Sequence, residues 1–127
     1  MNIIISNNSD DPLYKQIKDQ IKESILKNEL VEGDVLPSIR NFASDINVSV
    51  LTIRRVYQEL EEEGFVKRQA GLGTFVSSGN LDLIKDAKYR AIEEQLKKVI
   101  KDAKMLNISI EELREMVELL YEEDIYE

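Results

Sequence analysis

Cysteine, histidine and tryptophan are all absent from this chain of 127 residues. Without cysteine and histidine, the usual thiolate and imidazole metal sites are excluded. Cysteine nucleophiles and histidine acid–base catalysis are excluded for the same reason. We therefore expect no metal ion and no cofactor, and the lack of cysteine permits a reducing compartment.

The chain also lacks a long apolar run and a basic leader. No apolar segment approaches the roughly 20 residues that a membrane-spanning helix needs. Three isoleucines stand within residues 1–6, but no basic residue precedes them. We expect a cytoplasmic protein without membrane attachment, in which these isoleucines add a short strand or pack on the C-terminal part.

Apolar residues make up 43% of the chain, enough for one core and a small appendage. The first helical pattern follows Asp11, which we expect to cap the helix, and Pro12, which we expect at its first position. The helix is expected to end near Asn28. Its apolar face repeats every four residues, at Leu13, Ile17, Ile21 and Ile25.

Two further helical patterns follow, separated by a tight turn at Asn47 and Val48. The first opens at Ser38, and the second is capped by Ser49, whose hydroxyl can accept a backbone N–H. The apolar face of the first consists of Ile39, Phe42, Ala43 and Ile46. The second is expected to bury Ile53, Val56, Tyr57 and Leu60.

A hairpin completes this unit. Gly64 ends the preceding helix, residues 65–68 predict a strand, residues 69–73 a turn and residues 74–77 the returning strand. Three helices followed by a hairpin wing form a winged helix-turn-helix, which is a DNA-reading device. We therefore predict a mainly α fold in which residues 1–79 form this winged DNA-binding domain.

The start of the last of these helices carries the best candidates for reading DNA. A recognition helix presents its N-terminal turns to the major groove, where Val50 or Leu51 can touch a thymine methyl group and Arg54 can reach guanine or phosphate. Arg40, one helix earlier, is expected near the DNA backbone. Val50 and Leu51 can instead simply cover the turn between the helices, and Arg55 can be either a contact or solvated surface.

The tip of the wing carries a second group of candidates. Lys67 and Arg68 stand just before Gly71 and Gly73, and the glycines allow the chain to approach DNA closely while the two cations neutralise phosphates. Alternatively, both cations are ordinary solvent-exposed side chains with no DNA contact. The two glycines lie in a hairpin and do not precede a helix, so they are no phosphate-binding loop. With no convincing carboxylate pair or nucleophile either, we predict that the protein is not an enzyme.

These motifs closely resemble those of the GntR family of bacterial transcription regulators. The family's three signatures appear here as LPSIR at 36–40, VSVLTIR at 48–54, and EGFV leading to GLGTFV at 63–76. The resemblance implies DNA contacts by Arg40 and Arg54, a phosphate contact by Thr52, and entry of the wing into the minor groove at Gly71. Many members have arginine where this chain has Val50, which implies a changed operator. The complete candidate set for DNA binding is Arg40, Ser49, Val50, Leu51, Thr52, Arg54, Arg55, Lys67, Arg68 and Gly71.

The net charge of −8 opposes a simple attraction to DNA. Residues 36–79, however, hold five basic and five acidic side chains. Four of these acids stand at the far end of the recognition helix, where they can point away from DNA. Residues 80–127 hold thirteen acidic and eight basic residues, so part of the excess acid belongs to the C-terminal part and local polarity is compatible with DNA binding.

Residues 80–127 are predicted to form a tail of two amphipathic helices. The first has an apolar stripe within residues 83–105, and the second opens with a capping box of Ser109 and Glu112. Two such helices cannot hide both stripes within one chain, so pairing with the tail of a second copy is expected. The alternative is packing of the first stripe on the first helix. The residues expected to pair two copies are Ile84, Ile92, Leu96, Val99, Leu113, Val117 and Leu120.

The short tail is similar to that of the YtrA-like subgroup of the family, in which it acts as a dimerisation device. We therefore expect a homodimer that binds an inverted-repeat operator on double-stranded DNA, and the resemblance implies repression. The alternative function is a winged-helix adaptor for protein contacts without sequence-specific DNA binding. Tyr89, Tyr121 and Tyr126 raise the alternative of a small effector pocket, although aromatic residues at helical spacing usually just pack. The sequence identifies no effector.

Overall fold

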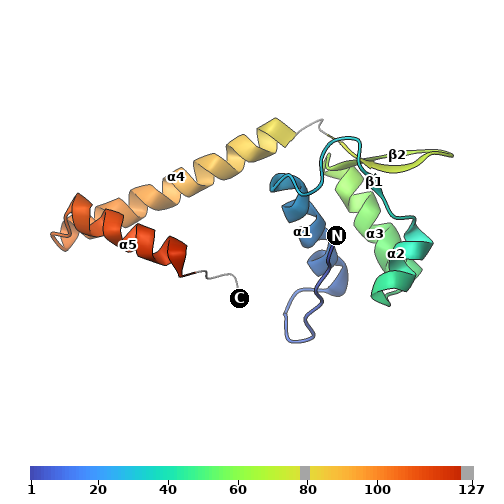
Figure 1. Cartoon of the computed structure of the whole chain (residues 1–127), viewed down its shortest axis with the longest axis horizontal. Coiled ribbons are helices and arrows are strands. Elements are labelled where there is room, and N and C mark those ends of the chain that lie inside the picture. Colours follow the sequence, from blue (N-terminus) through green and yellow to red (C-terminus); the bar gives the residue numbers. More distant parts are fainter. Residues whose placement is uncertain (78–80, 124–127) are drawn as a thin grey trace. The chain divides into compact units, whose positions relative to one another are not determined.

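The structure, a computed structural model shown in Figure 1, describes residues 1–77 and 81–123. The chain divides into two compact units, an N-terminal unit of Met1–Lys85 and a C-terminal unit of Asp86–Glu127. The elements in chain order are α1 (Leu13–Leu26), β1 (Val35–Leu36), α2 (Ile39–Ile46), α3 (Val50–Glu62), β2 (Val66–Gln69), β3 (Gly73–Val76), α4 (Leu81–Met105) and α5 (Ile110–Glu122). The fold is mainly helical, with a winged helix-turn-helix followed by two C-terminal helices, as predicted. The assignment of separate roles to residues 1–79 and 80–127 stays a prediction.

Helix α1 begins one residue later than the sequence suggests. Pro12 is extended, with φ −57° and ψ 155°, and takes the cap position itself. The predicted cap at Asp11 is therefore wrong: the carboxylate of Asp11 lies 3.6 Å from Lys15 Nζ, and no side chain caps the helix. At the other end Asn28 adopts a left-handed φ of 64°, which confirms the predicted end of the helix.

Helices α2 and α3 are both started by serine. The Ser38 hydroxyl accepts the Asn41 N–H at 3.1 Å, and the Ser49 hydroxyl accepts the Thr52 N–H at 3.0 Å, which confirms the predicted cap at Ser49. Between the helices Asn47 has a left-handed backbone, φ 59° and ψ 50°, which asparagine tolerates better than most residues. These local signals place α3 directly after α2 through a turn of a few residues.

The sheet consists of three antiparallel strands in the order β1-β3-β2. Strand β3 pairs with β2, where Gln69 lies opposite Gly73, and with β1, where Val35 lies opposite Phe75. The wing strands start within one residue of the predicted positions. Strand β1 is absent from the sequence prediction, because two residues are too few to show an alternating pattern. It anchors the root of the wing to the segment that leads into α2.

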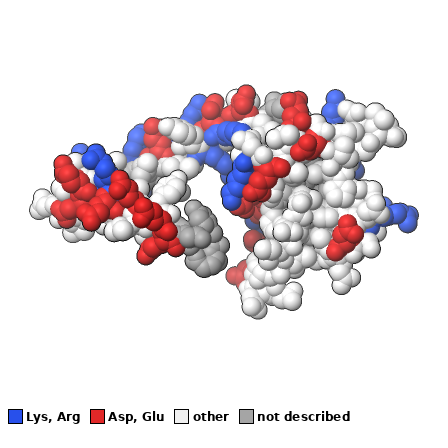
Figure 2. Space-filling view, in the orientation of Figure 1, with Lys and Arg blue, Asp and Glu red and all other residues white. Residues whose placement is uncertain are grey.

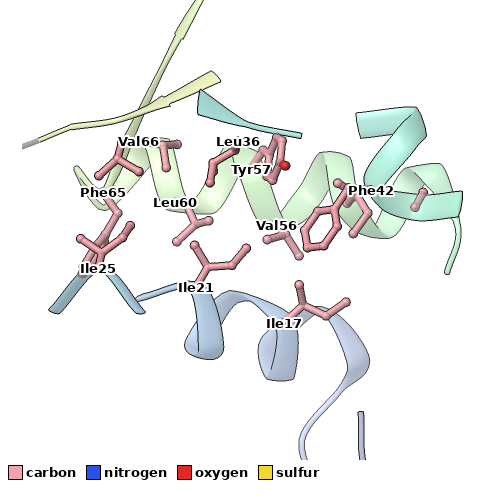
Figure 3. Close-up of a cluster of buried hydrophobic side chains, with 13 residues drawn as sticks. Ile17, Ile21, Ile25, Leu36, Phe42, Val56, Tyr57, Leu60, Phe65 and Val66 are labelled. Atoms are coloured by element: carbon pink, nitrogen blue, oxygen red, sulfur yellow. The ribbon is translucent and has the colours of Figure 1, made fainter. Parts of the chain in front are cut away.

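The core of the N-terminal unit forms between α1 and α3. In Figure 3 Ile17 and Ile21 of α1 face Val56 and Leu60 of α3, and Ile25 lies next to Phe65. Tyr57 is fully buried and stacks on Phe42, with ring centroids 6.1 Å apart. Its hydroxyl donates to the carbonyl of Pro37 at 2.7 Å, and burial raises the pKa of Tyr57. Helix α3 is therefore held on one side by α1 and on the other by the segment before α2.

The residues before α1 form an N-terminal arm with a turn at residues 7–8. Of the two alternatives for its isoleucines, the short strand is wrong, since residues 1–6 carry no strand. Ile3 packs against the core of the N-terminal unit. The arm is held by two glutamines of α1. The Ile4 N–H donates to Gln20 Oε1 at 2.8 Å while Gln20 Nε2 donates back to the Ile4 carbonyl. Gln16 binds the N–H and the carbonyl of Ser6 in the same way, at 2.9 and 3.0 Å.

Helix α4 begins on the core of the N-terminal unit, where Leu81 and Ile84 pack and Lys85 Nζ lies 3.3 Å from Asn28 Oδ1. Ile84 thus differs from the other predicted pairing residues, and its role in pairing stays a prediction. No described helix is long and apolar enough to cross a membrane.

Helix α5 opens with the predicted capping box. The Ser109 hydroxyl accepts the Glu112 N–H at 3.1 Å, and the Glu112 carboxylate accepts the Ser109 N–H at 3.3 Å. Tyr89 and Tyr121 are exposed by more than 70%, and Tyr126 lies outside the described residues. A small effector pocket between two tails, the alternative that these tyrosines raise, is not tested by a single chain.

Candidate nucleic-acid interface

The first turn of α3 presents an uneven surface. Leu51 is 70% exposed and Arg54 is exposed, whereas Val50 is half-buried and packs against the core. Thr52 is half-buried, and its hydroxyl lies 2.7 Å from that of Ser49. The two hydroxyls fix the start of the helix, and the exposed leucine and arginine are the side chains most open to a ligand.

Arg40 and Arg54 line one open depression between α2, α3 and the wing. Part of its surface is apolar, contributed by Val35, Leu36, Ile39, Val50 and Leu72. The structure thus brings together three members of the predicted DNA-binding set, two arginines and Val50, although they come from different helices. Guanidinium groups bind phosphate and guanine, while an apolar surface suits sugars and thymine methyl groups, so the depression has the chemistry of a DNA contact.

The two cations of the wing make different contacts. Lys67 and Arg68 are neighbours in β2, so their side chains leave opposite faces of the wing. The Arg68 N–H donates to Glu61 Oε2 at 2.9 Å, and Arg68 Nε lies 3.2 Å from Glu61 Oε1. These bonds, with the backbone N–H foremost, hold the pKa of Glu61 below its usual range. Arg68 therefore ties the wing to α3, while Lys67 shares the other face with Phe75.

Arg55 lies against α1 and does not line the depression. Its guanidinium carbon is 3.5 Å from the centroid of the Tyr14 ring, and its Nε is 2.9 Å from Glu59 Oε2. A DNA contact by Arg55 has to compete with both of these partners. The stacking on Tyr14 was not visible from the sequence, because it depends on how α1 crosses α3.

The acidic end of α3 is neutralised by α1. Lys18 Nζ lies 2.9 Å from Glu59 and 2.8 Å from Glu63, and Lys22 Nζ lies 2.6 Å from Glu63. Hydrogen bonds from Arg55 and then from Lys18 lower the pKa of Glu59. Burial alone would raise the pKa of Glu63, but the bonds from the two lysines outweigh it, and the pKa is lowered.

These ion pairs help to explain how a chain with a net charge of −8 is compatible with DNA binding. Two of the four clustered acids, Glu59 and Glu63, are taken up by lysines of α1, and a third, Glu61, is taken up by the wing. Sequence reasoning missed Lys18 and Lys22 as their partners. The available signal was the four-residue spacing common to the lysines of α1 and the glutamates of α3, which places each pair on one helix face.

The site combines the serine-capped helix α3, two arginines around an apolar depression and a basic hairpin. Together these features define a DNA-binding protein of the winged helix-turn-helix class. Comparison with known proteins narrows this class. Residues 13–76 match the family described as bacterial regulatory proteins, gntR family. The chain belongs to the GntR family of DNA-binding transcription regulators, which are not enzymes.

Individual relatives extend the likeness over most of the chain. The HTH-type transcriptional repressor YtrA of Bacillus subtilis is 37% identical over 115 residues, which cover 91% of this chain and 88% of that protein. Among solved structures, YtrA from Sulfolobus acidocaldarius, a GntR-family transcription factor, is 42% identical with a TM-score of 0.58, covering 72% of this chain and 97% of that one. A transcriptional regulator from Oenococcus oeni is 26% identical with a TM-score of 0.66, covering 92% of this chain and 97% of that one.

Proposed function

We propose that this regulator is a repressor that binds an inverted-repeat operator as a homodimer. The carrying observation is the depression shared by Arg40 and Arg54 beside the exposed first turn of α3. The B. subtilis relative that is similar over most of the chain is named a repressor, which supports repression rather than activation. In the proposal, residues 1–79 read DNA and residues 80–127 pair two copies. The other predicted DNA contacts, Ser49, Val50, Leu51, Thr52, Arg55, Lys67, Arg68 and Gly71, keep their proposed roles.

The proposed pairing rests on apolar side chains that the C-terminal unit leaves exposed. Among its described residues Ala103 is the one buried apolar side chain. Ile92 is 60% exposed, Leu96 47% and Leu120 50%. Each buried apolar Å² stabilises an association by roughly 25 cal/mol, so a second copy that covers both stripes offers a strong driving force. The same surface includes Val99, Leu113 and Val117.

The charges of α4 and α5 favour one arrangement of the two copies. Helix α4 carries seven basic and five acidic residues, whereas α5 carries five acidic residues and one basic residue. Figure 2 shows acidic side chains gathered over α5. Opposite charges across an interface favour one arrangement over others, so we propose that α5 of one copy packs beside α4 of the other.

A twofold dimer presents two identical reading helices. The operator is then an inverted repeat whose half-site centres are separated by about one helical turn, roughly 10 base pairs, or by a multiple of it. The experiment that tests the proposal is selection of bound duplexes from a random DNA pool at physiological salt. The expected result is an enriched inverted repeat, and its absence would overturn the proposal in favour of a protein-interaction adaptor.

Arg54→Ala supplies the matched control for this selection. The side chain is exposed, so the variant is expected to stay folded and dimeric while losing operator affinity. An adaptor would keep its partner binding in the same variant. Sedimentation equilibrium of both proteins checks that the loss comes from DNA contact and not from dissociation of the dimer.

A further inference from the structure

The wing ends in a narrow tip formed by Ala70, Gly71 and Leu72. The Leu72 N–H donates to the Gln69 carbonyl at 2.9 Å and closes a tight turn between β2 and β3. Gly71 and Gly73 flank the leucine with φ of 78° and 119°, a left-handed backbone that glycine adopts without strain. A Cβ at either glycine would meet no atom of the described structure within 4 Å. The tip is therefore slender, and Leu72 carries its one bulky side chain.

Leu72 is exposed in a place where packing does not explain a leucine. Its exposed fraction is 70%. The side chain also lines the depression that Arg40 and Arg54 share, so it lies on the same face as the start of α3. Leu51 at the start of α3 is also 70% exposed, but it does not line the depression.

We propose that Leu72, at the tip of a wing whose entry into the minor groove the family resemblance implies, selects A·T over G·C in the base pairs that flank each half-site. This inference rests on the proposed function. The minor groove of B-DNA is only about 6 Å wide, and a tip with two glycines fits where side chains on either side of the leucine would not. Lys67, in the strand that leads to the tip, supplies charge for the phosphates along the groove.

The selection follows from what each base pair presents on the floor of the minor groove. G·C pairs expose the 2-amino group of guanine there, whereas A·T pairs expose only acceptors. An aliphatic side chain pressed against the amino group obstructs it and removes it from water without offering an acceptor. Apolar side chains also wedge between base steps, which is easiest at flexible pyrimidine–purine steps. Leu72 therefore acts by excluding guanine and by favouring deformable flanks.

The test uses the full chain and the operator recovered by selection, with the flanking pair located by hydroxyl-radical protection. That pair is made in four forms: A·T, G·C, inosine·C and diaminopurine·T. Inosine·C keeps the major-groove pattern of G·C without the minor-groove amino group, and diaminopurine·T adds that amino group to A·T. We expect equal affinity for A·T and inosine·C, and about five- to tenfold weaker binding of the other two.

Leu72→Ser removes the apolar side chain and keeps the glycines, and it is expected to bind all four duplexes within about twofold of one another. Leu83→Ser, the same change at a leucine of α4 that is 69% exposed and lies outside the proposed DNA contacts, is the matched control and is expected to keep the wild-type pattern. Circular dichroism confirms that both variants are folded. The slope of affinity against salt is expected to stay unchanged in Leu72→Ser, because no phosphate contact is lost.

The proposal is overturned if the wild-type protein binds G·C and inosine·C equally, which would assign any preference to the major groove. It is also overturned if Leu72→Ser keeps the discrimination. Failure of the proposed function looks different, because the wild-type protein would then enrich no sequence in the selection. That outcome would overturn both proposals together.

Discussion

The hydroxyl of Tyr57 links α3 to the segment before α2 through one hydrogen bond. It donates to the carbonyl of Pro37 at 2.7 Å, and Pro37 directly precedes the serine cap of α2. Tyr57→Phe keeps the buried ring and its contact with Phe42, so the change removes the hydrogen bond alone. A hydrogen bond of this kind contributes about 1 kcal/mol, and an acceptor left unpaired away from water adds to the loss. We expect the free energy of unfolding to fall by about 1–2 kcal/mol.

For a chain of this size such a loss corresponds to a melting temperature lower by about 4–8 °C. The measurement is thermal and urea denaturation followed by circular dichroism, at one fixed protein concentration because dimerisation would make stability concentration-dependent. Tyr89→Phe is the matched control, since Tyr89 is 71% exposed and the same chemical change there is expected to stay within about 0.5 kcal/mol. Equal stability of Tyr57→Phe and the control would refute the reasoning.

Three further predictions concern charge, DNA binding and assembly. Glu63→Gln is expected to lower the free energy of unfolding by about 1 kcal/mol at pH 7. The folded pKa of Glu63 is lowered, so the extra stability of the wild type is present above the ordinary glutamate pKa of about 4.3. It disappears as the pH falls through the folded pKa. Urea denaturation between pH 3 and pH 7 measures the difference, and a constant gap over that range would contradict it. Arg54→Ala is expected to weaken operator binding by about 1–3 kcal/mol in a gel-shift titration, whereas Glu94→Ala, an exposed change in α4, should leave affinity unaltered. Leu96→Glu places a charge in the proposed pairing surface and is expected to shift sedimentation from dimer to monomer. Leu83→Glu, at an exposed leucine that is not one of the pairing residues, should leave the dimer intact, and a dimeric Leu96→Glu would rule out the surface.

Local signals made much of the fold predictable. The caps at Ser49 and Ser109 are confirmed because a capping hydroxyl needs only the backbone three residues ahead. The buried face of α3, including Tyr57, follows from helical spacing alone. The start of α1 was misplaced because a proline can serve either as cap or as first residue, and only the observed ψ of Pro12 distinguishes the two.

The features that escaped prediction depend on which elements meet. Strand β1 exists only because β3 lies beside it, and the salt bridges of Lys18 require α1 to cross the far end of α3. The candidate site shows the same limit. The sequence pointed to Arg40 and Arg54 separately, but the placement of Leu72 on the depression beside them is a property of the folded wing.

The two glutamines of α1 hold the N-terminal arm through its main chain and not through its side chains. Each amide offers one acceptor and one donor to a single residue, as a neighbouring strand would. The arm is therefore insensitive to which side chain stands at Ile4, which is 76% exposed. It is sensitive to proline at that position or at Ser6, since proline has no N–H to donate. Side chains on the outward face of this arm can therefore change while the arm stays in place. A helix that packs by side-chain shape does not tolerate such changes on its packed face.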